Sequence, residues 1–331
     1  MRWIIRIVGA FALLLAAFIY LNNASWLTSA PKSRPILLAH RGLAQTFDLD
    51  GVTNDTCTAT RIHAPTHPYL ENTLASMEAA FRAGADIVEF DVHPTTDSHF
   101  AVFHDWTLDC RTDGNGVTRE HSLPQLKALD VGYGYTADGG KTFPFRGKGV
   151  GLMPALEEVL MAFPDRRFLI HIKSNDPREG EQLASHLAML PPAQRAHLIV
   201  YGGTLPVENL RAHLPDMRTM SRASLTQCLL RYIAIGWSGY VPAACHHSLV
   251  LVPINAAPWL WNWPNGFLNR MARAGSIVVV VGPYSPGEFS RGVDSEAEFA
   301  QLPPGFAGGI WTNRIDRIGA LVRPGHQGGL R

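Results

Sequence analysis

The sequence alternates between short apolar runs and longer amphipathic segments from residue 36 onward. The runs have the length of β-strands, whereas the segments between them have the length and apolar spacing of helices. Such alternation is typical of βα units arranged around a parallel sheet. No repeat, low-complexity tract or domain boundary interrupts the pattern after residue 35. We therefore expect one α/β domain, and an α/β barrel of about 250 residues would fit this length.

The pattern gives nine candidate strands and eight candidate helices. The expected strands are Ile36–Ala39, Ile87–Val92, Phe100–Phe103, Phe168–Ile172, Leu198–Tyr201, Arg218–Met220, Leu249–Pro253, Ile277–Val281 and Gly309–Trp311. The expected helices are Asn72–Ala83, Leu123–Leu129, Pro154–Ala162, Glu179–Leu190, Val207–Leu214, Leu225–Ile235, Gly266–Ala274 and Ser295–Gln301. Because a barrel of this kind has eight strands, one candidate is wrong or lies outside the barrel, and the sequence does not indicate which.

The N-terminal segment is apolar enough to cross a membrane. Residues Ile7–Leu21 form an uninterrupted apolar run, and Trp3–Ile5 bring it near the roughly 20 residues that a bilayer requires. We expect a transmembrane helix that anchors residues 1–22 in the membrane, a linker over residues 23–35 and the barrel domain over residues 36–331.

A cleaved signal peptide is the alternative for this segment. Thr28-Ser29-Ala30 offers the small residues of a cleavage site, but Pro31 directly follows it and disfavours cleavage. The flanking positive charges only weakly favour a cytoplasmic N-terminus.

The charge balance excludes a strong global field. The chain has 29 Lys and Arg residues against 28 Asp and Glu residues, a net charge of +1. A nucleic-acid partner is therefore not expected, and any recognition of phosphate must be local.

The four cysteines Cys57, Cys110, Cys228 and Cys245 lack the spacing of a metal site. If all are bridged, three pairings are possible. Cys57 and Cys110 lie in polar, loop-like stretches and are the preferred pair if the domain folds outside the cytoplasm. Cys228 lies in an apolar stretch, where a buried free thiol is the alternative.

Two long connections interrupt the alternation. Residues 43–70 form a polar insertion after the first strand, and residues 131–151 are rich in glycine and aromatic residues. Loops longer than about 15 residues are usually functional lids or disordered. The second segment matches no phosphate-loop spacing, so we interpret it as an ordinary flexible loop.

Charged or imidazole groups stand at four strand ends, where the active sites of barrels lie. The first strand ends in His40-Arg41-Gly42, and the second carries Glu89 and Asp91. The third ends in His104-Asp105, and the fourth carries His171-Ile172-Lys173. Four such ends predict one shared site.

Each group in this site has a chemical use. Glu89 and Asp91 are two residues apart, so a strand directs both carboxylates to the same side, as a Ca²⁺ or Mg²⁺ ion requires. His40 and His104 can transfer protons near neutral pH. Arg41 and Lys173 can bind phosphate oxygens.

The motifs together resemble the signature series of the glycerophosphodiester phosphodiesterase family. They comprise His40-Arg41-Gly42, Glu71-Asn72-Thr73, Gly84–Val92, Val102–Asp105, Leu108 with Arg111-Thr112, Met153–Leu160 and Gly309–Arg314. Order and spacing match over residues 36–316, most specifically over residues 36–173.

The resemblance implies a TIM-like (β/α)8 barrel that hydrolyses glycerophosphodiesters to glycerol 3-phosphate and an alcohol. It makes His40 and His104 the acid and base, without deciding which is which, and makes Glu89 and Asp91 metal ligands. Arg41 and Lys173 become phosphate contacts. Glu71 would support the site, by pairing with Arg41.

The fourth strand departs from the family, which usually has a metal-binding Glu where this chain has His171. We expect His171 to bind the metal as a neutral imidazole, which would shift preference from Ca²⁺ or Mg²⁺ toward Mn²⁺ or Zn²⁺. The alternative is that His171 contacts only phosphate or water, and a neighbour such as His93 completes the metal shell.

Two other functions stay open at this point. The anchor and the tryptophans at 259, 261 and 263 would suit a phospholipase-D-like activity on lysophospholipids or sphingolipids, although packing is the preferred role for these tryptophans. Loss of a ligand charge at His171 would suit a catalytically weak phosphodiester-binding protein. The sequence implies no protein partner, and the resemblance places the domain outside the cytoplasm.

Overall fold

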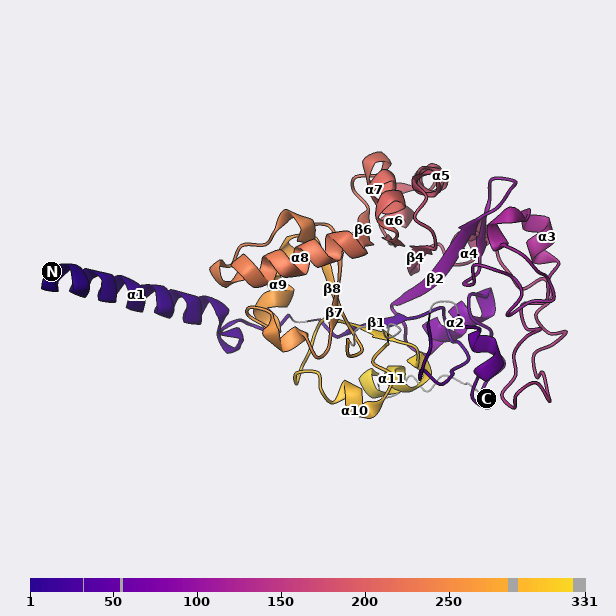
Figure 1. Cartoon of the computed structure of the whole chain (residues 1–331), viewed down its shortest axis with the longest axis horizontal. Helices are drawn as coiled ribbons and strands as arrows, with labels where there is room; N and C mark the ends of the chain where they lie inside the picture. The colour runs from indigo at the N-terminus through magenta and orange to yellow at the C-terminus, as the bar shows by residue number, and fades with distance from the viewer. Residues whose placement is uncertain (32, 54–55, 285–290, 324–331) are drawn as a thin grey trace.

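The computed structural model describes residues 1–31, 33–53, 56–284 and 291–323. Eight parallel strands form its centre, in the order β6-β5-β4-β2-β1-β9-β8-β7 (Figure 1). They are β1 (Ile36–Ala39), β2 (Ile87–Pro94), β4 (Arg167–Ile172), β5 (Leu198–Gly202), β6 (Arg218–Ser221), β7 (Leu249–Pro253), β8 (Ile277–Val281) and β9 (Gly309–Thr312). A parallel bridge between Thr219 and Ser248 joins β6 to β7. The sheet is thus a nearly closed barrel, which confirms the expected TIM-like fold.

The ninth expected strand lies outside the barrel. β3 (Phe100–Val102) pairs antiparallel with the end of β2, with Val92 opposite Val102 and Pro94 opposite Phe100. β2 is longer than the sequence suggested because its last residues belong to this hairpin rather than to the parallel sheet. Its extension carries the chain from Asp91 toward His104.

Helices follow the strands as the alternation predicted. They are α2 (Leu74–Arg82), α3 (Leu123–Lys127), α4 (Leu156–Ala162), α5 (Pro177–Ala188), α6 (Pro192–Arg195), α7 (Thr204–His213), α8 (Arg222–Ile235), α9 (Asn265–Arg273), α10 (Glu296–Phe299) and α11 (Ile315–Val322). The eight expected helices are confirmed with shifts of a few residues at their ends. α6 and α11 were not expected from the sequence.

Alternation along the strands divides the core into two layers. Because successive strand residues face opposite sides, one set fills the barrel and the other packs under the helices. The inner cluster contains Leu38, Ile87, Leu169, Ile199, Met220, Leu249, Val279 and Trp311. The outer cluster includes Leu37, Val88, Phe168, Val200, Val250 and Ile310.

Residues 43–70 and 131–151 pack together beside the barrel around a separate small core. Ala59, Ile62 and Leu70 of the insertion contact Tyr135 and Phe145 of the glycine-rich segment there. The glycine-rich segment is a loop, as expected, but hydrogen bonds to Asp130 hold it in one conformation. The Asp130 carboxylate accepts backbone N–H groups from Gly132, Gly147 and Gly149.

Two disulfides join all four cysteines. Cys57–Cys110 is the preferred pair and is confirmed, with its Cα atoms 5.5 Å apart. Cys228 pairs with Cys245, so the alternative of a buried free thiol at Cys228 is wrong. The sequence did not indicate this pairing, because no local pattern predicts the path of the loop between α8 and Cys245.

The N-terminal helix α1 (Arg2–Asn23) projects from the barrel (Figure 1). It has no buried residue, and its mean hydropathy and length are those of a helix that could span a membrane or of a signal sequence. Its last turn is fixed to the barrel, because the Asn22 and Asn23 amides donate to the Trp237 carbonyl at 2.9 and 2.7 Å. Arg270 of α9 donates to the Asn22 carbonyl at 2.7 Å.

Each disulfide should stabilise the fold, and the one that closes the longer loop should stabilise it more. The sequence separations are 53 residues for Cys57–Cys110 and 17 for Cys228–Cys245. Loop-closure entropy then gives contributions of about 4 and about 3 kcal/mol to the free energy of unfolding. We expect both paired Cys→Ser variants to melt below the wild type in a calorimetric scan, the 57/110 variant at the lower temperature. Equal melting temperatures in oxidised and reduced wild type would contradict this expectation.

Candidate active site

The barrel register brings the sequence-predicted site residues to one edge. Ala39 of β1 is level with Val88 of β2, and Asp91 of β2 is level with His171 of β4. His40 directly follows β1, and Lys173 directly follows β4. The carboxyl ends of these strands therefore converge, as expected for a barrel.

Two carboxylates form the centre of the site. Glu89 and Asp91 are both fully buried. The Tyr201 hydroxyl donates to Glu89 Oε1 at 2.7 Å, and the Asn72 amide donates to Asp91 Oδ2 at 3.1 Å. His171 Nδ1 lies 2.8 Å from Asp91 Oδ1 and stacks on the ring of Tyr201.

The charge at this centre is incompletely balanced. Burial and the neighbouring Asp91 raise the pKa of Glu89. Burial opposes ionisation of Asp91 too, but the Lys173 ammonium, 3.5 Å from Oδ1, helps to hold the pKa of Asp91 well below its usual range. A buried carboxylate whose pKa is raised by a second carboxylate is a group that a cation would stabilise.

Glu89, Asp91 and His171 together fit a divalent metal ion. Each offers a ligand atom, and these atoms lie within 4.8 Å of one another. Burial lowers the pKa of His171, so its imidazole is neutral near pH 7 and able to coordinate. His93, the alternative ligand, instead has Nε2 3.4 Å from the His104 carbonyl.

His40 is held by the far end of the chain. Its Nδ1 lies 2.6 Å from Asn313 Oδ1, and the Asn313 amide in turn donates to Asp294 Oδ2 at 2.7 Å. This arrangement directs the other ring nitrogen, Nε2, toward Glu89 Oε2 at 3.7 Å. Burial, assisted by the Arg41 charge, lowers the pKa of His40 to about 3, so its ring is neutral.

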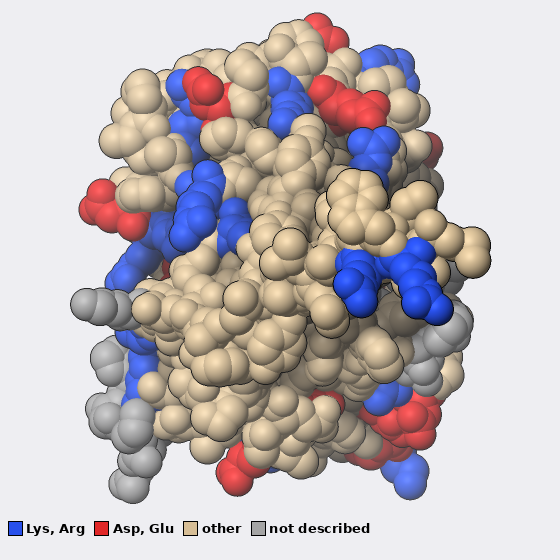
Figure 2. All heavy atoms as spheres, turned by 90° about the vertical axis from the view of Figure 1, so that its left-hand side faces the viewer, with Lys and Arg blue, Asp and Glu red and all other residues tan. Residues whose placement is uncertain are grey.

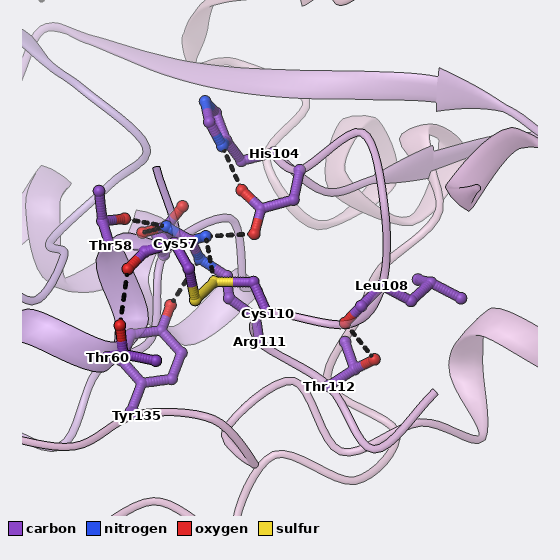
Figure 3. Close-up of a disulfide and its surroundings, with 11 residues drawn as sticks. Cys57, Thr58, Thr60, His104, Leu108, Cys110, Arg111, Thr112 and Tyr135 are labelled. Carbon is purple, nitrogen blue, oxygen red and sulfur yellow. Dashed lines mark hydrogen bonds and ion pairs between the residues drawn. A yellow bond between two sulfur atoms is a disulfide. The ribbon is translucent and has the colours of Figure 1, made fainter. Parts of the chain in front are cut away.

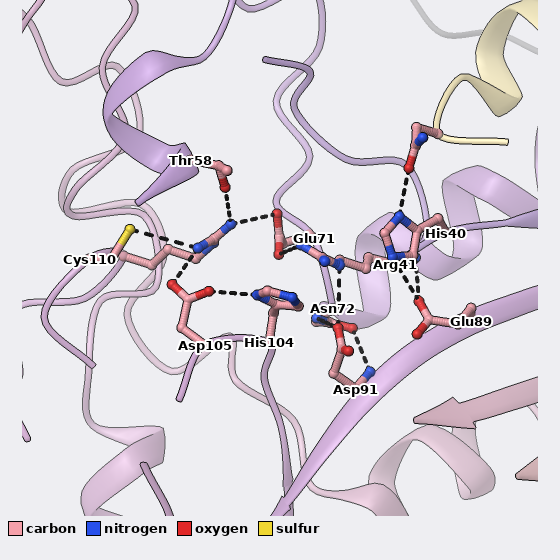
Figure 4. Close-up of polar contacts among 12 residues, drawn as sticks. His40, Arg41, Thr58, Glu71, Asn72, Glu89, Asp91, His104, Asp105 and Cys110 are labelled. Atoms are coloured by element: carbon pink, nitrogen blue, oxygen red, sulfur yellow. Dashed lines mark hydrogen bonds and ion pairs between the residues drawn. The ribbon is translucent and has the colours of Figure 1, made fainter. Parts of the chain in front are cut away.

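His104 is held in the same manner by a carboxylate. Its Nδ1 lies 2.6 Å from Asp105 Oδ1, which leaves Nε2 free of protein contacts among those described. Burial and the Arg41 charge lower the pKa of His104 to about 4. Two neutral imidazoles, each with Nδ1 occupied, therefore stand on either side of the Arg41 and Asp91 side chains (Figure 4).

Arg41 links the two halves of the site. Its Nη1 donates to Glu71 Oε1 at 3.0 Å, which confirms the expected Arg41–Glu71 pair, and its Nε lies 3.4 Å from Asp91 Oδ2. Arg41 has φ +56°, and the next residue, Gly42, has φ +80°. A Cβ at Gly42 would lie 2.6 Å from Ser76 Oγ, so the tight turn that aims Arg41 requires glycine.

A cavity of about 180 Å³ opens beside His40 and Arg41. The insertion lines one wall of it through Ala44, Gln45, Thr46, Phe47, Leu49 and His63. Asp294, Asn313 and Arg314 line the opposite wall. The first βα connection therefore shapes the space next to the predicted catalytic groups, as its length suggested.

Five residues of the site had no predicted role. They are Asn72, Asp105, Arg111, Tyr201 and Asn313. Four lie in the quoted motifs, and two of these, Asn72 and Asp105, directly follow residues that were assigned roles, which was a usable signal. Tyr201 lies at the end of an expected strand, where its position alone pointed to the site.

Comparison with known proteins agrees with this geometry. Residues 40–194 match the model of the "Glycerophosphoryl diester phosphodiesterase family". A glycerophosphodiester phosphodiesterase of Caldanaerobacter subterraneus is 38% identical over 103 residues, 31% of this chain and 39% of the relative. One of Bacillus subtilis is 30% identical over 180 residues, 49% of this chain and 60% of the relative. The matches thus cover less than two thirds of these relatives.

Solved structures agree over more of the chain. A glycerophosphodiester phosphodiesterase from Agrobacterium tumefaciens has a TM-score of 0.57 at 22% identity, covering 88% of this chain and all of that one. A phosphodiesterase of Oleispira antarctica, solved with the product sn-glycerol-3-phosphate, has a TM-score of 0.53 at 18% identity over 87% of this chain and 97% of that one. At these identities the likeness shows the fold. The family match over residues 40–194 and the motifs make this part of the chain similar to the glycerophosphoryl diester phosphodiesterase family.

Proposed function

We propose that this protein hydrolyses glycerophosphodiesters to glycerol 3-phosphate and an alcohol. The observation that carries the proposal is the pair of oriented, partly buried imidazoles of His40 and His104 beside the fully buried Glu89–Asp91 carboxylates. A phosphodiester needs one proton acceptor for the attacking oxygen and one proton donor for the leaving oxygen. The family match over residues 40–194 and the names of the relatives support the same activity.

In the proposed reaction the neighbouring hydroxyl of the glycerol moiety attacks phosphorus. One histidine accepts the hydroxyl proton at Nε2. The other, which takes up a proton at Nε2 when the negative phosphodiester binds beside it, gives that proton to the departing alcohol. The resulting cyclic phosphate is opened by water, and this second step runs the two proton transfers in reverse. Arg41 and Lys173 neutralise charge on the non-bridging oxygens, and Glu71 holds Arg41 in place. Glu89, Asp91 and His171 would hold a divalent ion, which when bound adds positive charge near the phosphate.

Activity on lysophospholipids is the second candidate. The observation in its favour is α1 together with Trp259, whose side chain is 81% exposed on the β7–α9 connection. Trp261 and Trp263 pack against the main core instead, so of these tryptophans only Trp259 is free to meet lipid. The third candidate, a weak phosphodiester-binding protein, has no need for two oriented imidazoles.

His40→Ala and His104→Ala should each lower kcat on the order of 10²- to 10⁴-fold, as expected for loss of a general acid or base. His213→Ala, which removes an exposed imidazole on α7, should change kcat little. The measurement is release of alcohol from glycerophosphoethanolamine, with thermal melts of each variant. Near-normal kcat in a folded His40 or His104 variant would remove that residue from the proposed mechanism.

His171 gives a test of the metal site. We propose that the neutral imidazole favours Mn²⁺ or Zn²⁺ over Ca²⁺ and Mg²⁺, because it is softer and less negative than a carboxylate. His171→Glu should shift the ranking toward Ca²⁺ and Mg²⁺, in both calorimetric binding and activity. Identical rankings and affinities in the two proteins would mean that His171 does not bind the metal.

We also propose that α1 is an uncleaved membrane anchor and that the barrel lies outside the cytoplasm. Both disulfides support the oxidising compartment. Several exposed apolar side chains lie on the segments next to the end of α1: Trp26, Leu27, Leu230, Ile233, Ile235 and Tyr240. Figure 2 views this side; uncharged side chains fill its centre, and both basic and acidic side chains lie around them. The exposed apolar side chains next to α1 suit contact with the interface of a bilayer.

The anchor predicts that the mature protein keeps its first residues. Mass spectrometry of the protein from a membrane fraction should find peptides from residues 1–21 and both disulfides. The protein should remain with the membrane after a carbonate wash, because about 20 apolar residues span the bilayer. A mature N-terminus at Pro31, or free thiols on all four cysteines, would contradict this proposal.

A further inference from the structure

The Cys57–Cys110 disulfide lies next to the network that holds the predicted catalytic groups. It joins the insertion of residues 43–70 to the segment after β3 (Figure 3). The residues that directly follow the two cysteines are Thr58 and Arg111, and they are themselves bonded. Arg111 Nη2 donates to Thr58 Oγ1 at 2.7 Å. The disulfide and the hydrogen bond therefore join the same two segments, residues 57–58 and 110–111.

Arg111 is among the most buried charged groups of the protein. Its side chain is 2% exposed, so each of its N–H groups needs a partner inside the protein. Nε donates to the Tyr135 hydroxyl at 3.1 Å, and the remaining nitrogens reach Thr58, Asp105 and Glu71. Because these bonds fix the position of the Arg111 side chain, Arg111 can in turn fix the positions of the Asp105 and Glu71 carboxylates.

Each carboxylate leads to a predicted functional group. Asp105 accepts from Arg111 through Oδ2 and contacts His104 Nδ1 through Oδ1 at 2.6 Å. Glu71 accepts from Arg111 through Oε2 at 3.3 Å and from Arg41 through Oε1 at 3.0 Å. Figure 4 shows both branches, one ending at His104 and the other at Arg41.

We propose that Arg111 is a positioning residue and that the Cys57–Cys110 disulfide, with Thr58, clamps it in place. The clamp sets the orientation of the His104 imidazole through Asp105 and the orientation of Arg41 through Glu71. This inference rests on the proposed function, since it assigns His104 and Arg41 a part in turnover. It adds that the insertion after β1 is needed for catalysis as well as for shaping the cavity.

The second disulfide provides a matched control. Cys228 and Cys245 join α8 to the short helix η5 (Ala243–Cys245). Among the contacts described, this pair has none with His40, Arg41, Glu71 or His104. Its removal therefore tests the general effect of losing a disulfide on a folded, anchored barrel.

The first test changes one hydrogen bond and keeps the disulfide. Thr58→Val in the full-length protein removes the Thr58 acceptor, whereas Thr60→Val removes an exposed hydroxyl of the same short helix that bonds only the Cys57 carbonyl. We expect Thr58→Val to lower kcat about tenfold, with KM within about twofold, because a bond to a buried charge is lost. Thr60→Val should match the wild type. Equal kcat in both variants would overturn the proposal.

The second test removes each disulfide in turn. The paired Cys57→Ser/Cys110→Ser variant, assayed well below its melting temperature, should lose more turnover than the paired Cys228→Ser/Cys245→Ser variant. Asp105→Asn should also lose turnover, and its effect should not add to that of the 57/110 change if both act through His104. Fully additive losses, or equal losses from the two disulfides, would contradict a clamp on His104.

A readout without turnover separates this inference from the proposed function. Histidine ¹⁵N NMR, with the His104 signals assigned from His104→Ala, reports which ring nitrogen carries the proton. Thr58→Val should change the His104 signals and leave those of His40 unchanged, because His40 is held by Asn313 instead. If the wild type cleaves no glycerophosphodiester but this change occurs, the proposed function fails and the clamp stands. Unchanged His104 signals would overturn the clamp.

Discussion

The burial of two carboxylates two residues apart on β2 is the constraint on which the site depends. Glu89 and Asp91 are fully buried at the edge of the barrel, where like charges without compensation would be costly. The surrounding groups offset part of that cost. Arg41 and Lys173 bring positive charge to Asp91, and the Tyr201 hydroxyl donates a hydrogen bond to Glu89. Glu89, whose raised pKa a bound cation would lower, and the nearby imidazole of His171 fit a cation at this position.

The two histidines that we propose as proton carriers are oriented by elements that are distant in the sequence. His40 follows the first barrel strand but is oriented by Asn313 after the last one, which couples its geometry to closure of the barrel. His104 follows β3, the hairpin strand outside the barrel, and is oriented through Asp105 by a buried arginine. The insertion and its disulfide stabilise the second arrangement, so an extension of a common fold becomes part of the site.

Much of this structure follows from local sequence patterns. The strand boundaries and the shared position of His40, Glu89, Asp91 and His171 come from strand periodicity and from the rule that parallel strands end at one edge. The strand at Phe100–Val102 was expected, but the sequence did not indicate that it was the one outside the barrel, because a short apolar run does not reveal whether it pairs parallel or antiparallel.

The features that could not be predicted from the sequence depend on contacts that no local pattern reveals. The bond between His40 and Asn313 joins residues that follow the first and the last barrel strand, and the pairing of Cys228 with Cys245 depends on the path of the loop after α8. Arg111 appeared in a motif, but its role depends on burial against Thr58 and Tyr135, which no periodicity reports.

We propose that the site cleaves the phosphodiester bond between glycerol 3-phosphate and an alcohol. Full-length protein in detergent should be incubated with glycerophosphoethanolamine, and separately with a lysophospholipid, in the presence of Ca²⁺, Mg²⁺, Mn²⁺ or Zn²⁺, and the products identified by mass. We expect glycerol 3-phosphate and ethanolamine from the first substrate with at least one metal, and little release from the second. Release from the lysophospholipid alone, or from neither substrate with any of the metals, would contradict it.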